Sequence, residues 1–247
     1  MSGHNKWSTI KRKKEKVDAQ RGRVFTRLIK EITIAARLGG GDPDSNARLR
    51  TAVLSAKTQN MPADNITRAI KKGTGELPGV NYEEVLFEGY GPGGTAIMVE
   101  TLTDNKNRTL PEIRHIFSKY NGNLGTSNSV AWIFSKKGLI QIPANASTED
   151  DLLEILLEAD VEDIQLEDEF FSITLPPNQF ENAKELLTQK SIPISHSELS
   201  MVPQNTKKLE GREAESMLKL MDALEEQDDV QNVYSNFDID DDALMQD

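Results

Sequence analysis

Cysteine is absent from this chain of 247 residues, and histidine occurs only three times. Without cysteine there is no disulfide scaffold, no thiolate metal site and no cysteine nucleophile. His4, His115 and His196 have neither the H-x-x-x-H nor the H-E-x-x-H spacing of a zinc site. A P-loop and a G-x-S-x-G nucleophile elbow are also missing. We therefore expect a protein that is not an enzyme and that uses no metal and no cofactor.

Long apolar runs are missing too. No stretch approaches the roughly 18 consecutive apolar residues of a membrane-spanning helix. Residues 1–30 lack the apolar core of a secretory signal. Their basic start superficially resembles a mitochondrial transit peptide, but the helical pattern that begins near Asp18 continues into the first predicted core. We expect a cytoplasmic protein without a membrane partner.

The charge of the chain is unevenly distributed. The net charge of −11 by itself argues against a polyanionic partner such as nucleic acid. However, residues 1–75 carry 17 Lys and Arg against 6 Asp and Glu, whereas residues 76–247 carry 12 against 34. A basic run is often only a solvated surface, but this one is almost single-signed over its first thirty residues, which favours nucleic-acid contact. The acidic remainder would repel the same polyanion and orient the molecule on it.

The basic side chains at the start of the chain are the candidate nucleic-acid-binding residues. Trp7 lies among them, where it could stack on a base or anchor the arm to the helical domain, and the sequence does not separate these roles. The candidates are Lys6, Trp7, Lys11, Arg12, Lys13, Lys14, Lys16, Arg21, Arg23, Arg27 and Lys30.

Three short helices are predicted in the basic part. Apolar residues recur at three- and four-residue steps over residues 18–38, and the glycines at 39–41 end this pattern. Asp42-Pro43 or Asp44 is expected to open a second helix, and Met61-Pro62 a third. The connection at residues 39–41 is open rather than tight, which argues against a base-reading helix-turn-helix and favours contact with the phosphate backbone.

Beyond residue 79 the apolar period changes to two, which predicts an α+β region. Strands are expected at 85–90 and 95–102, a helix from a capping box at 109–112, and a further strand at 130–134. The order βαββαβ that follows is that of a ferredoxin-like unit. A last helix and strand have no partner except the earlier sheet, so this unit is predicted to be inserted.

The predicted fold class is therefore α+β multidomain, with an N-terminal three-helix domain followed by two α+β, ferredoxin-like domains, the last inserted in the middle one. The predicted domains are a basic helical domain with an N-terminal arm (1–76), an α+β domain (77–136 plus 205–239), the inserted βαββαβ domain (137–204) and an acidic tail (240–247).

Two further segments have candidate chemistry. Residues 89–94, Gly-Tyr-Gly-Pro-Gly-Gly, formally match G-x-G-x-x-G, but the dinucleotide motif needs a helix directly after the glycines, and a strand is predicted here. We interpret them as a hairpin turn. Lys106, Arg108 and Thr109 lie at a predicted helix start, where free amides and two cations suit an anion. A phosphate-binding loop and a plain solvent-exposed loop fit this segment equally well.

Several segments resemble the YebC/PmpR family, whose mitochondrial relatives include the translational activator of cytochrome c oxidase subunit I. The resemblance spans essentially the whole chain. It is carried by residues 1–11 (Met-Ser-Gly-His-Asn-Lys-Trp-Ser-Thr-Ile-Lys), 25–41, 88–94 (Glu-Gly-Tyr-Gly-Pro-Gly-Gly), 104–109 (Asp-Asn-Lys-Asn-Arg-Thr) and 228–233 (Asp-Asp-Val-Gln-Asn-Val). It implies three domains in a cytoplasmic protein that is not an enzyme.

The function that we expect is a nucleic-acid-binding regulator of gene expression. The resemblance implies either a DNA-binding transcriptional regulator or a ribosome-associated translation factor that aids synthesis of proline-rich stretches. DNA and rRNA present the same phosphates to residues 1–75, so the charge pattern fits both. A different class, a protein-interaction scaffold that uses the acidic α+β domains, is the remaining alternative. We expect a monomer.

Overall fold

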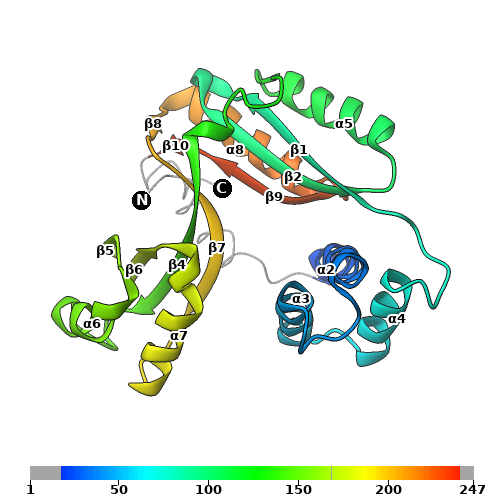
Figure 1. Cartoon of the computed structure of the whole chain (residues 1–247). Helices are drawn as coiled ribbons and strands as arrows, with labels where there is room; N and C mark the ends of the chain where they lie inside the picture. Colours follow the sequence, from blue (N-terminus) through cyan, green and yellow to red (C-terminus); the bar gives the residue numbers. More distant parts are fainter. Residues whose placement is uncertain (1–17, 168, 240–247) are drawn as a thin grey trace. The chain divides into compact units, whose positions relative to one another are not determined.

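Three helices form the N-terminal part of the described chain, which covers residues 18–167 and 169–239 of a computed structural model. They are α2 (Asp18–Gly39), α3 (Ala47–Thr58) and α4 (Ala63–Gly73) (Figure 1). Their apolar faces form a common core in which Ile32, Leu49 and Ala56 are fully buried. The side-chain oxygen of Asn46 accepts a hydrogen bond from the backbone N–H of Leu49 at 3.1 Å, so α3 begins after this cap and not at Asp42 or Asp44 as predicted.

A four-stranded sheet with the order β3-β1-β2-β9 belongs to the same compact unit, which comprises Met1–Ala131 and Asn205–Asp247. All neighbouring strands in it are antiparallel. The strands are β1 (Glu83–Tyr90), β2 (Ala96–Thr103), the short β3 (Asn123–Leu124) and β9 (Val230–Ser235). In the same unit, β8 (Lys207–Lys208) and β10 (Phe237–Asp238) form a short parallel pair.

The glycine-rich segment 89–94 is the turn of a hairpin. A 3₁₀ turn at Pro92–Gly94 joins β1 to β2, and these two strands pair along their whole length. Gly93 and Gly94 have φ angles of 66° and 75°, which glycine adopts without the steric cost that a side chain would add. Because a strand follows the glycines, the hairpin interpretation is confirmed.

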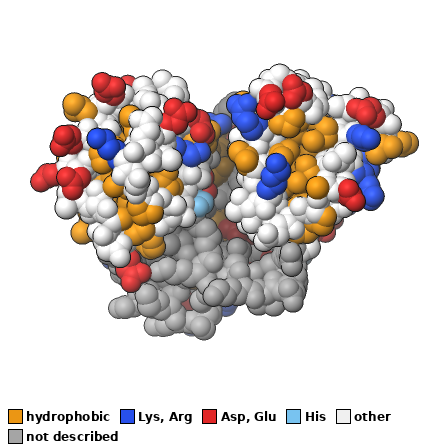
Figure 2. All heavy atoms as spheres, turned by 90° about the horizontal axis from the view of Figure 1, so that it is seen from below, with side chains coloured by type: hydrophobic (Ala, Val, Ile, Leu, Met, Phe, Trp, Pro, Cys, Tyr) orange, Lys and Arg blue, Asp and Glu red, His pale blue; other side chains and the backbone are white. Residues whose placement is uncertain are grey.

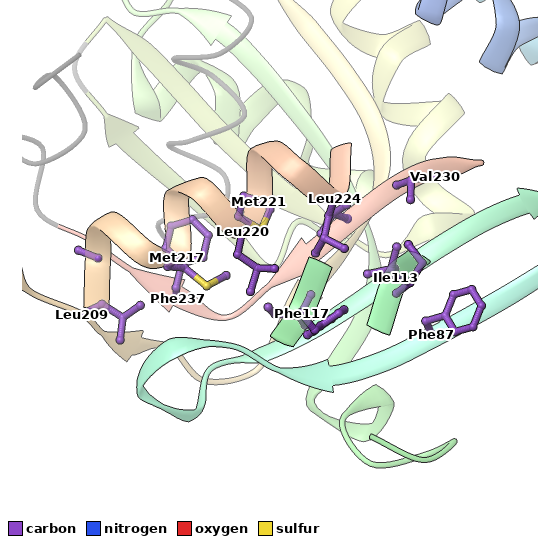
Figure 3. Packing of buried hydrophobic residues seen from close by; sticks show 14 of the residues in the cluster. Phe87, Ile113, Phe117, Leu209, Met217, Leu220, Met221, Leu224, Val230 and Phe237 are labelled. Carbon is purple, nitrogen blue, oxygen red and sulfur yellow. The ribbon is translucent and has the colours of Figure 1, made fainter. Parts of the chain in front are cut away.

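Two helices, α5 (Lys106–Lys119) and α8 (Gly211–Glu226), pack on this sheet. Figure 3 shows Ile113 and Phe117 of α5 lying near Leu220 and Leu224 of α8, and all four side chains are fully buried. Helix α5 begins earlier than the predicted capping box at 109–112. Its cap is Asn105, which accepts a hydrogen bond from the N–H of Arg108.

The second compact unit is Trp132–Gln204. Its elements follow the order β4 (Phe134–Pro143), α6 (Glu149–Ile155), β5 (Asp163–Glu167), β6 (Phe170–Leu175), α7 (Phe180–Gln189) and β7 (His196–Pro203). The strands form an antiparallel sheet with the order β5-β6-β4-β7. This is the βαββαβ arrangement of ferredoxin-like domains. The predicted fold class, α+β with a helical N-terminal part followed by sheet-containing domains, is confirmed.

The strand predicted at residues 130–134 is wrong. Ala131–Ile133 form a 3₁₀ turn, and Phe134 is the first residue of β4 in the second unit. The physical reason is the buried carboxylate of Glu88, which accepts hydrogen bonds from the N–H groups of Asn128, Val130 and Ala131 at 2.7–2.8 Å. Backbone donors that are used by a side chain are not available to a neighbouring strand.

Phe117 lies at the centre of the core between α5, α8 and the sheet. Phe117→Ala should lower the free energy of unfolding by about 3–5 kcal/mol, because it removes buried apolar surface and leaves a cavity. Urea unfolding monitored by circular dichroism measures the change. Leu86→Ala in β1, where the side chain is 44% exposed, is the control and should cost much less. An equal loss in both variants would contradict this account of the core.

Candidate nucleic-acid interface

The predicted nucleic-acid-binding residues fall into two groups. Arg21 belongs to α2, but its side chain is not among those described. Arg23, Arg27 and Lys30 lie further along α2 with described side chains. The remaining candidates lie outside the described residues, namely Lys6, Trp7, Lys11, Arg12, Lys13, Lys14 and Lys16.

Two of the three described α2 candidates, Arg23 and Arg27, bind the end of another helix. Positions 23, 27 and 30 share one face of α2 because they are separated by four and three residues. Arg23 forms an ion pair with Glu226 at 3.4 Å, and Arg27 donates a hydrogen bond to the carbonyl oxygen of Glu225. These partners lie at the C-terminal end of α8, where the helix dipole adds partial negative charge. This basic stripe therefore has an anionic partner within its own unit.

Lys30 is committed to the interior. Its side chain is only 8% exposed, and its Nζ donates to Asp229 Oδ1 at 2.8 Å and to the carbonyl oxygen of Asp228 at 2.9 Å. The ring of Tyr82 lies 5.7 Å from the same ammonium group, within the range of a cation–π contact. The assignment of Lys30 to a phosphate contact is corrected accordingly, because an ammonium group buried against a carboxylate is not available to an external anion.

Asp229 is the anion that the predicted phosphate loop binds. Its Oδ2 accepts hydrogen bonds from Arg108 Nη2 and from Thr109 Oγ1, both at 2.7 Å. Thr103 Oγ1 lies 3.2 Å from the same oxygen. Thr109 is fully buried, so its assignment to an external anion is corrected, and Lys106 is exposed and outside this network. Within the loop, Arg108 and Thr109 are therefore bonded to Asp229, whereas a role of Lys106 in anion binding stays a prediction.

The electrostatics of this cluster favour the charged form of Asp229. Burial by itself would raise the pKa of the carboxyl group. Hydrogen bonds from Lys30, Arg108 and Thr109 outweigh burial and hold the pKa well below its ordinary value. The carboxyl of Glu88 behaves in the same way, because hydrogen bonds from the backbone of residues 128–131 outweigh its burial and lower its pKa. Both carboxylates are parts of the folded framework.

Free cations occur instead on α3 and α4. Lys57 of α3 and Arg68, Lys71 and Lys72 of α4 are exposed, and within the described residues none of them has an ion-pair partner. Figure 2 shows Lys and Arg side chains among apolar ones on the visible face of the helical region. These four residues belong to the basic segment 1–75, but they are not among the candidates predicted from the sequence. The adjacent pair Lys71-Lys72 is the feature of the sequence that could have pointed to these residues. The sequence by itself does not show which cations lack an acidic partner.

Other kinds of site are not seen in the part of the chain that is described. Among residues 18–167 and 169–239, no group of three or more His, Asp or Glu side chains is placed to hold a metal ion. No helix in these ranges is long and apolar enough to cross a bilayer. Fold and site together define a class: a multidomain α+β protein whose N-terminal helices carry unpaired cations.

The chain belongs to the TACO1/YebC family. The model of the TACO1/YebC N-terminal domain matches residues 5–76, and the model of the second and third domains matches residues 82–237. The resemblance seen in the sequence motifs is confirmed.

Similar proteins extend over nearly the full chain. A protein of Desulforapulum autotrophicum named "Probable transcriptional regulatory protein" is 59% identical over 98% of both chains. One of the same name from Geobacter sulfurreducens is 56% identical over 97% of this chain and 96% of its own. The crystal structure of the conserved hypothetical protein Aq1575 from Aquifex aeolicus has a TM-score of 0.81 at 48% identity and covers 92% of this chain and 93% of that one.

Asp229→Asn should strongly destabilise the first unit. The substitution leaves the Lys30 ammonium buried without a counter-charge, which is expected to cost about 3 kcal/mol or more. Urea unfolding at neutral pH measures the loss. Asp228→Asn is the matched control, because its side chain is exposed and its contact with Lys30 is made by the backbone carbonyl. If both variants were as stable as the parent protein, the pair would have no structural role.

The lowered pKa values of Asp229 and Glu88 predict a loss of stability in acid. A carboxyl group whose pKa is lower in the folded state stabilises the fold above its unfolded pKa, near 4, and this contribution is lost as the pH falls further. The free energy of unfolding should therefore fall between about pH 5 and pH 3.

Two substitutions test whether Glu88 contributes to this loss of stability in acid. Glu88→Gln should show a shallower decline in acid than the parent protein, since one of the two titrating carboxyls is removed. Asp44→Asn, at an exposed position, should decline as the parent does. Urea midpoints across the pH series measure the slopes, and equal slopes for Glu88→Gln and the parent would refute the role of Glu88.

Proposed function

We propose that this protein is a nucleic-acid-binding regulator of gene expression, specifically a DNA-binding transcriptional regulator that contacts DNA through residues 1–75. The observation that carries the proposal is the set of exposed cations on α3 and α4 that have no acidic partner among the described residues. Arg23, Arg27 and Lys30 contribute to folding instead. Unpaired Lys and Arg side chains release condensed counterions from a phosphate backbone, which is the main source of sequence-independent affinity.

The distribution of charge supports the same proposal. Residues 76–247 have an excess of acidic side chains, and on the face drawn in Figure 2 Asp and Glu predominate among the charged groups of the second unit. A polyanion would be repelled by these surfaces and attracted to the helical region, so that binding occurs in one orientation. The acidic surfaces then remain available to a protein partner.

The names of similar proteins favour transcription over translation. Both relatives described above are named as transcriptional regulatory proteins. The proposal includes a monomeric protein in the cytoplasm with no catalytic step. If the protein instead co-sediments with ribosomes in a salt-sensitive manner and binds duplex DNA no better than a charge-matched polyanion, the ribosome-associated alternative replaces it.

Binding to duplex DNA should depend steeply on salt. If about six to eight phosphates are contacted, the logarithm of the association constant should fall against the logarithm of salt concentration with a slope of roughly −5 to −7. Fluorescence anisotropy with the full-length chain measures the slope. Replacing Lys11, Arg12, Lys13, Lys14 and Lys16 by Ala should weaken binding and flatten the slope. A slope near zero in the parent protein would overturn the proposal, whereas unchanged binding in the variant would restrict the contact to the cations of α3 and α4.

A further inference from the structure

Helices α3 and α4 are joined by a tight turn. Residues 59–62 connect them, and Asn60 adopts the left-handed conformation with φ at 57°. The turn is closed by hydrogen bonds from the N–H of Asn60 to the carbonyl of Lys57 and from the N–H of Met61 to that of Ala56, both at 2.9 Å. Met61 is buried in the helical core, so the turn is anchored. Two helices with a short, closed turn of this length are the elements of a helix-turn-helix unit.

The second helix of this pair has one buried face and one polar face. Ile66 and Ala69 are buried in the core, and Gly73 lies so close to α2 that a Cβ would clash with the carbonyl oxygen of Thr33. The opposite face exposes Asp64, Thr67, Arg68 and Lys71, which recur at three- and four-residue steps. Helix α4 is therefore held by α2 on one side and presents a continuous polar stripe on the other.

The other described helices of this region offer no comparable stripe. In α2 the side chains of Arg23, Arg27 and Lys30 are bonded to residues 225–229. In α3, Arg48 forms ion pairs with Glu31 and Glu84, and Arg50 donates to backbone carbonyls of the preceding loop. The cations of α4 are left to meet an external anion.

We propose that α3 and α4 form a helix-turn-helix unit whose second helix, α4, enters the major groove of duplex DNA, where Arg68 reads a guanine and Lys71 and Lys72 neutralise phosphates. An α-helix with its side chains is about 10–12 Å wide and fits the roughly 12 Å major groove of B-DNA. The deep, narrow major groove of A-form RNA does not admit it. This inference rests on the proposed function and names the element and the residues that carry it out.

Asp64 supports base reading over contact with phosphates alone. An exposed carboxylate near the start of α4 repels phosphates, so it weakens a helix that lies only on the backbone. Inside the major groove the same carboxylate accepts a hydrogen bond from the N4 amino group of cytosine. Arg68 lies four residues further along the same stripe, where its planar guanidinium suits the O6 and N7 atoms of guanine.

The test uses the full-length chain and a library of random duplexes of about 20 base pairs. The parent protein should enrich a sequence that contains a required guanine. Arg68→Ala should lose that requirement and bind the enriched duplex about 5- to 150-fold more weakly. Arg68→Lys should also lose the requirement while keeping the salt slope, because lysine retains the charge but not the bidentate geometry. Lys71→Ala should weaken binding to all sequences alike and make the salt slope less negative by about 1.

Arg114→Ala is the matched control, since it removes one exposed arginine from α5 in the sheet region. It should select the same sequence as the parent with unchanged affinity, and thermal melting confirms that each variant is folded. If the parent binds DNA but the Arg68 and Lys71 variants behave like Arg114→Ala, the role of α4 is refuted while the proposed function stands. Tighter binding to duplex RNA of the same sequence also refutes it. If the parent binds no nucleic acid at low salt, the proposed function itself fails.

Discussion

The buried carboxylate of Asp229 is the interaction on which the first unit depends. It joins Lys30 of α2 to Arg108 and Thr109 of α5 at the point where the chain leaves α8 and enters β9. Charges removed from water are tolerated only when they are paired and hydrogen-bonded, so the buried Lys30 ammonium and Asp229 carboxylate require each other. Because α3 and α4 share a core with α2, the cluster also fixes the helical region on its sheet.

Pairing with Asp229 and with the end of α8 divides the cations of the helical region into two kinds. The first kind comprises the cations of α2 that face α8 and Asp229. They bind acidic groups and the C-terminal end of α8, and they stabilise the fold. Those of α3 and α4 that face away remain exposed. The proposed function needs both kinds, because the helices must be held in place before their outer side chains can bind a polyanion in a defined orientation.

Four of the five segments that carry the family resemblance lie within the described residues and have structural roles. Residues 25–41, 104–109 and 228–233 each contribute to the Asp229 cluster, through Lys30, through Arg108 and Thr109, and through Asp229 itself. Residues 88–94 contribute Glu88, which holds the loop at 128–131, and the glycines of the β1–β2 turn. These four segments thus contribute to how the first unit is built, whereas the polar stripe of α4 lies outside them.

The sequence by itself determined the division of charge, the helical and sheet-forming regions and the βαββαβ order, because composition and apolar period are local properties. It misplaced the start of α5 and the strand at 130–134, since Asn105 and Glu88 use backbone donors in ways that periodicity does not reveal. Only the tertiary structure decided which cations are free. Lys30 and Asp229 are 199 positions apart, and a contact between such distant residues follows from the packing of the whole unit and not from the pattern around either one.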